Sequence, residues 1–141
     1  MAVAAITGQM AGYERWIYRG TPDRVGAVRR RLRRRLGVHH PCLDRVALCA
    51  SETCTNALMH TASGSDDPWR YWFAVEIEWA DEWVKTSVHD TGAISLPHLV
   101  RAAEADENGR GLQIVKSEAD EWGDGPSPNG LGRVVWFIVH A

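Results

Sequence analysis

The sequence predicts an α+β fold, a two-layer sandwich in which helices pack on one face of a mixed, mainly antiparallel sheet. Two amphipathic helical segments come first, and residues 69–89 then alternate in the manner of a β-hairpin, which implies antiparallel pairing rather than a doubly wound sheet. The 141 residues, 45% hydrophobic and 24% charged, are typical of one soluble globular domain. We therefore expect a single domain over residues 13–141, preceded by a flexible tail over residues 1–12.

The first helix is expected to begin at Thr21-Pro22-Asp23, with Thr21 as its cap, and to end at Gly37. Its apolar stripe consists of Val25, Val28, Leu32 and Leu36. A second helix is predicted from Leu43 to Met59. One side of it is lined by Val46, Ala47, Ala50, Cys54, Ala57 and Leu58.

Strands are predicted around these helices and at the end of the chain. Tyr13 to Tyr18 is expected to form a short edge strand, and Trp69 to Trp79 and Trp83 to His89 form the hairpin. A last strand runs from Val134 to Val139. Between the hairpin and this strand, we expect a short helix at Pro97 to Ala105 and a firmer one at Gly111 to Ala119.

The charge balance limits the classes of partner. Sixteen Lys and Arg residues against eighteen Asp and Glu give a net charge of −2, which argues against direct nucleic-acid or membrane binding. The first helix nevertheless carries an arginine cluster, which is either a solvated face or a docking surface that includes Arg30, Arg31 and Arg34. Without a basic, apolar leader or a long apolar run, the protein is expected to be cytoplasmic. Cys42, Cys49 and Cys54 then fit reduced core thiols.

Three short segments carry residues suited to chemistry. Glu52 and Asn56 lie four positions apart on the second helix and so share one face, where their oxygens suit Mg²⁺ and a carboxylate can act as a base. Asp90 ends an apolar strand, can accept a hydrogen bond from an exocyclic amine, and precedes Gly92 by two residues. The glycines around Arg110 precede a helix, whose N-terminus favours phosphate.

Together these segments resemble the ATP-binding boxes of the superfamily that contains gyrase, the histidine kinases and the anti-sigma-factor serine kinases. The stretch from Ser51 to His60 looks like the N box, His89 to Gly92 like the first glycine box, and Gly109 to Val115 like the second. The chain is most similar to the short anti-sigma type, which also ends in a Trp-Gly and a Val-Trp strand, here Trp122-Gly123 and Val135-Trp136. The resemblance covers residues 20–141 and implies a Bergerat-type ATP-binding fold.

The resemblance also implies roles for individual residues. Asn56 would coordinate the Mg²⁺ that bridges the phosphates of ATP, and Glu52 would be the general base. Asp90 would bind the adenine amine, with Gly92 beneath the base. The phosphates would be held by Gly109, Arg110 and Gly111 under a lid over residues 93–108. For His60, both a packing or capping role and a position near phosphate stay open.

Two functions agree with this resemblance. In the first, the protein is an ATP-dependent serine kinase that phosphorylates an antagonist protein, of the anti-anti-sigma type, and sequesters a sigma factor; a homodimer is compatible with it. In the second, it is a non-catalytic interaction module whose partner binding is controlled by ATP. Glu52 favours catalysis. The second is favoured by Ala93, and by Val134 at a position where relatives often offer a hydroxyl to adenine.

Overall fold

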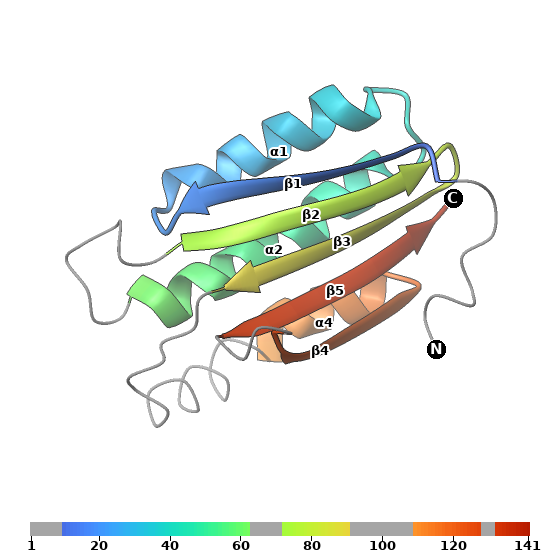
Figure 1. Ribbon diagram of the computed structural model, residues 1–141. Coiled ribbons are helices and arrows are strands. Elements are labelled where there is room, and N and C mark those ends of the chain that lie inside the picture. The colour runs from blue at the N-terminus through green and yellow to red at the C-terminus, as the bar shows by residue number, and fades with distance from the viewer. Residues whose placement is uncertain (1–9, 63–71, 91–108, 128–131) are drawn as a thin grey trace.

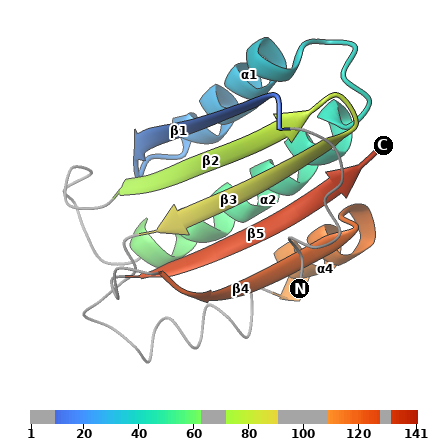
Figure 2. The ribbon, with the colours of Figure 1, turned by 45° about the vertical axis from the view of Figure 1, so that its right-hand side comes forward.

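The computed structural model describes residues 10–62, 72–90, 109–127 and 132–141; the side chains of residues 59–62 and 109–112 are outside this description. The described strands form one sheet in the order β1-β2-β3-β5-β4, with antiparallel pairing throughout. They are β1 (Gly12–Arg19), β2 (Trp72–Ala80), β3 (Trp83–Asp90), β4 (Glu121–Pro126) and β5 (Arg133–His140). The described helices all lie behind one face of this sheet, so the predicted two-layer α+β sandwich is confirmed (Figures 1 and 2). They are α1 (Asp23–Leu36), α2 (Leu43–Ala62) and α4 (Gly109–Glu118).

Helix α1 forms where the sequence predicts it, although its N-terminus differs in detail. Val28 and Leu32 are fully buried, as the stripe predicts. Thr21 does not cap the helix: its hydroxyl donates to the Asp23 carboxylate at 2.5 Å, and Pro22 occupies the N-cap position. Gly37 ends the helix with a φ of 89°, a conformation that costs glycine little. Its backbone N–H donates to the carbonyl oxygen of Arg33.

The hairpin explains why α2 lies at the centre of the molecule. Ala80 pairs with Trp83 across a two-residue turn, and Phe73, Val75 and Ile77 face the helices and are buried. Helix α2 packs on this apolar face and also touches α1 and α4. Cys49 and Cys54 on this helix and Cys42 just before it are buried and free, as predicted for core thiols. Among the described residues, no helix is both long and apolar enough to cross a membrane.

Strand β4 was not predicted, because its sequence EWGDGP is rich in residues that are rare in strands. It forms along the outer edge of β5, in register from Glu121 opposite Ile138 to Pro126 opposite Arg133. Gly123 is needed there, since a side chain would start only 2.6 Å from the Trp136 ring. Pro126 is tolerated at the end of an edge strand. At the other edge, β1 confirms the predicted edge strand; the expected tail lies mostly outside the described residues.

Candidate nucleotide site

Glu52 and Asn56 are presented by the middle of α2. Their neighbours Thr53, Cys54 and Ala57 are buried against the sheet side, with 3%, 0% and 5% of their surfaces exposed. Glu52 and Asn56 are only partly buried and lie one turn apart on the same face. The sequence expectation that a carboxylate and an amide share one face is therefore confirmed.

This face of α2 is directed towards α4. Arg45, Cys49, Glu52 and Asn56 follow one another at spacings of four, three and four residues, which places them on one stripe of the helix. Arg45 fixes the direction of the stripe, because its Nε donates to the carbonyl oxygen of Glu118, the last residue of α4, at 2.9 Å. We call the stripe of these four residues the α4 flank of α2.

The N-terminus of α4 lies level with the far end of this flank. Arg45 is in the first turn of α2 and contacts the last residue of α4, so the two helices run antiparallel (Figures 1 and 2). Gly109 and Glu118 are nine positions apart, which is a rise of about 13.5 Å along α4. Arg45 and Asn56 are eleven positions apart, which is a rise of about 16.5 Å along α2. The first turn of α4, Gly109 to Gly111, is therefore near Asn56 along the helix axis. It was expected as a loop, and the structure makes it helical.

Asp90 is the last residue of β3 and reaches the same end of the molecule. Strand register places it opposite Phe73, on the face that packs against the helices, and only 8% of it is exposed. The backbone N–H of Arg133, the first residue of β5, donates to Asp90 Oδ1 at 3.3 Å. Asp90 is thus a buried carboxylate oriented by a neighbouring strand, which suits recognition of an amine.

Arg133, rather than Val134, is the β5 residue beside Asp90. Val134 pairs with His89 and so lies on the face of the sheet away from the helices. The expectation that Val134 stands at the adenine contact is wrong, because successive residues of a strand point to opposite faces and Val134 is on the wrong one. No residue pattern indicates Arg133, because its contact with Asp90 is made by a backbone atom.

His89 anchors the end of β3 from the open face of the sheet. Its Nε2 lies 2.5 Å from Glu76 Oε1, and the Tyr13 hydroxyl donates to the other oxygen of Glu76. Arg15 also belongs to this group, because its Nη1 lies 3.7 Å from Glu76 Oε2. Burial alone would raise the pKa of Glu76, but the bonds to Tyr13 and His89 outweigh it and lower that pKa. This network joins β1, β2 and β3 on the open face of the sheet, and its member His89 directly precedes Asp90.

Several predicted site positions are outside the described residues. These are Gly92, the lid over residues 93–108 and the short helix expected at 97–105. The backbones of His60, Gly109, Arg110 and Gly111 are helical, but the side chains of His60 and Arg110 are not described. The described part of the site therefore consists of Glu52, Asn56 and Asp90 with the backbone of the α4 N-terminus.

The predicted arginine surface is divided by the structure. Arg31 is half-buried and stacks over the Trp16 ring, with its guanidinium carbon 4.9 Å from the ring centre. Arg30 and Arg34 are exposed. Arg30 lines a groove between α1 and α2, whereas Arg34 is not part of its lining. The three residues thus do not form one surface.

Comparison with protein families identifies the family to which this fold belongs. The model of the histidine kinase-like ATPase domain matches residues 18–139, from β1 to β5. The chain belongs to the histidine kinase-like ATPase family. It is therefore an ATP-binding domain. A comparison with curated proteins gives no match.

The donor set of this ATPase domain fits a magnesium nucleotide. Asn56 and Glu52 offer partly exposed oxygens on one face, and Mg²⁺ prefers oxygen ligands from one or two side chains together with phosphates and water. A helix N-terminus such as that of α4 favours phosphate, because its backbone N–H groups lack partners within the helix. Asp90 supplies a buried acceptor at the end of β3.

Proposed function

We propose that this ATP-binding domain is a regulator of the anti-sigma type, which phosphorylates a serine of an antagonist protein and sequesters a sigma factor. The position of Glu52 carries the proposal. Metal binding needs only Asn56, yet a carboxylate lies one turn away on the same flank of α2. A carboxylate at this distance from the metal ligand can act as the base in phosphoryl transfer, which favours catalysis over nucleotide binding alone.

In this proposal each residue has one task. Asn56 holds the Mg²⁺, which neutralises charge on the phosphates, and the first turn of α4 holds the phosphates by its backbone. Asp90 accepts the hydrogen bond of the adenine amine. Glu52 accepts the proton of the serine hydroxyl while the serine oxygen bonds to the γ-phosphorus and the bond to the ADP oxygen breaks.

Glu52→Gln tests the proposal, because it keeps the shape and hydrogen bonding of the side chain and removes its basicity. The variant should bind Mg-ATP as wild type does, yet transfer γ-labelled phosphate to candidate antagonists about 10²–10⁴-fold more slowly. Glu78→Gln is the matched control, since register places Glu78 on the open face of the sheet opposite Lys85. It should leave transfer unchanged.

Two results would contradict the proposal in different ways. Undiminished transfer by Glu52→Gln would remove Glu52 as the base but keep the kinase. No transfer from wild type, with ATP still altering partner affinity, would favour the second function, a non-catalytic interaction module controlled by ATP.

A further inference from the structure

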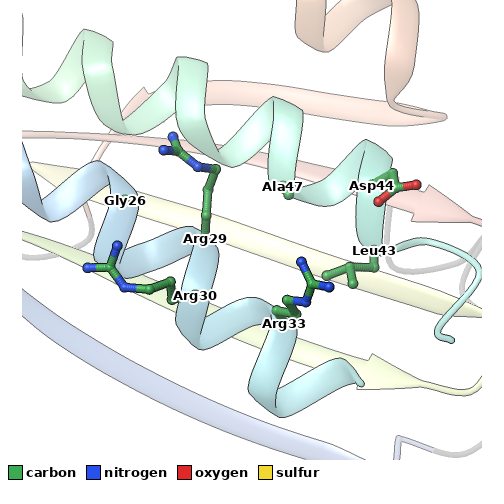
Figure 3. Close-up of a pocket in the computed structure, with 7 residues that line it drawn as sticks. All are labelled: Gly26, Arg29, Arg30, Arg33, Leu43, Asp44 and Ala47. Carbon is green, nitrogen blue, oxygen red and sulfur yellow. The ribbon is translucent and has the colours of Figure 1, made fainter. Parts of the chain in front are cut away.

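A concave site lies on the side of α2 that faces α1. It is a groove of about 290 Å³, and Figure 3 shows its two walls. The α1 wall is made by Gly26, Arg29, Arg30 and Arg33, and the α2 wall by Leu43, Asp44 and Ala47. In Figure 3, Arg29 and Arg33 extend from α1 towards α2, and Arg30 extends along α1 towards Gly26. We call this site the arginine groove.

The arginines of the groove differ from Arg24 and Arg35 near the two ends of α1. Arg24 pairs with Asp23 at 3.4 Å, and Arg35 pairs with Glu14 at 2.6 Å. In the groove, Arg29 donates to the Ser51 hydroxyl at 3.2 Å, and within the described part of the chain neither Arg30 nor Arg33 pairs with a carboxylate. Three guanidinium groups therefore face one carboxylate, that of Asp44.

Gly26 leaves room for the Arg29 and Arg30 side chains. A Cβ at this position would lie 3.2 Å from Arg30 Nη1 and 3.7 Å from Arg29 Nη2. Glycine inside a helix costs about 1 kcal/mol relative to alanine, so the sequence gives up stability here. The space it leaves is bordered by two guanidinium groups, and an anion beside them would offset their repulsion.

We propose that the arginine groove binds an acidic segment of a partner protein, with carboxylates one helical turn apart. Arg29 and Arg33 are four residues apart, about 6 Å along α1, which matches carboxylates four residues apart on a helix. Leu43 and Ala47 add an apolar surface to the opposite wall. Asp44 repels a compact dianion such as phosphate, but it can accept a free N–H from the first turn of a helical segment.

This site is separate from phosphoryl transfer and does not depend on the proposed function. The groove is formed by the first turns of α2, whereas Glu52 and Asn56 follow on the other flank. Loss of ATP binding would leave the proposal intact, and loss of the groove would leave the kinase intact.

The test uses the full chain and a labelled, alanine-based helical peptide with glutamates every fourth residue. We expect Arg29→Gln/Arg33→Gln to weaken its binding about tenfold, because both charge pairs of the proposed four-residue spacing are lost. Arg24→Gln/Arg34→Gln changes the net charge equally outside the groove, and it should weaken binding less than twofold. Fluorescence anisotropy at low and high salt measures both, and binding should weaken as salt rises.

Three outcomes would overturn the proposal. One is equal weakening by the two double variants, which would indicate general attraction to a basic helix. Another is equal binding of a peptide of the same composition with its glutamates spread around the helix. The third is displacement of the peptide by millimolar inorganic phosphate at constant ionic strength, which would assign the groove to a compact anion.

Discussion

The arginines on the two sides of α2 differ in whether they are held by hydrogen bonds within the protein. On the α4 flank, Arg45 donates to the backbone carbonyls of Glu118 and His140 at 2.9 Å each, and Cys49 beside it is fully buried. On the α1 side, Arg30 and Arg33 are exposed and lack carboxylate partners among the described residues. One flank is fixed before any ligand arrives, as positioning for chemistry requires, whereas the other can adapt to a partner.

Asp90→Ala should have the largest effect and should affect only one of the two sites. The change removes a buried, charge-assisted hydrogen bond worth about 1.5–3 kcal/mol, so ATP affinity should fall about tenfold to over a hundredfold. Binding of the acidic peptide should not change, because the sites are distinct. Calorimetry with both ligands measures this, and parallel loss of both would mean that the two regions are not independent.

Arg45→Met should show that the α4 flank is fixed by backbone contacts. It keeps an apolar stem but leaves the carbonyls of Glu118 and His140 without this donor, and should lower the free energy of unfolding by about 2 kcal/mol. Arg33→Met on the other side should change it by less than about 0.5 kcal/mol. Urea unfolding measures the free energy of unfolding of both variants. Similar losses in the two would show that Arg45 does not fix the α4 flank more firmly than Arg33 is held on the other side.

Alkaline pH should weaken the α4 flank through Cys49. Burial raises the pKa of this thiol from 9.0 to about 11. Between these values the unfolded chain loses the proton and the folded chain keeps it, so the stability of the native state falls as pH rises from 9 to 11. In Cys49→Ala, the free energy of unfolding should therefore fall by about 2 kcal/mol less than in wild type over this pH range. Urea unfolding at each pH measures this difference. Identical slopes would show that Cys49 is accessible to water.

Gly26→Ala should have the smallest effect on stability, and it should change stability and binding of the acidic peptide in opposite directions. Alanine should raise the free energy of unfolding by about 0.5–1 kcal/mol. Its Cβ displaces the Arg30 guanidinium, so the acidic peptide should bind more weakly to a more stable protein. Thermal melts and anisotropy measure the two quantities. If the variant were more stable and bound the peptide equally well, the glycine would have no role in the groove.

Much of the fold could be predicted because its elements follow strong periodicity. The stripe of Val28 and Leu32 and the alternation of Phe73, Val75 and Ile77 each fix one buried face. Strand β4 could not be predicted, since Gly123 and Pro126 are disfavoured in strands and are placed there by pairing with β5 and by the Trp136 ring. The Thr21 cap was wrong because Pro22 occupies the N-cap position, and the Thr21 hydroxyl donates to the Asp23 carboxylate instead of accepting from the helix.

The candidate site was predictable where spacing along one helix decides geometry, as for Glu52 and Asn56. It was not predictable where two strands meet. The neighbour of Asp90 is decided by the register of β3 and β5, and register selects Arg133 instead of Val134. The division of the arginines follows from packing, because Arg31 turns to Trp16 while Arg30 turns to Gly26.

Titration of the folded wild-type chain with ATP, with and without Mg²⁺, shows whether this domain binds a magnesium nucleotide. Calorimetry should detect one nucleotide per chain, bound more tightly with the metal because Asn56 contributes a ligand, and the melting temperature should rise with ATP concentration. Absence of both the binding heat and the rise in melting temperature, in a chain whose folding is shown by circular dichroism, would contradict the account.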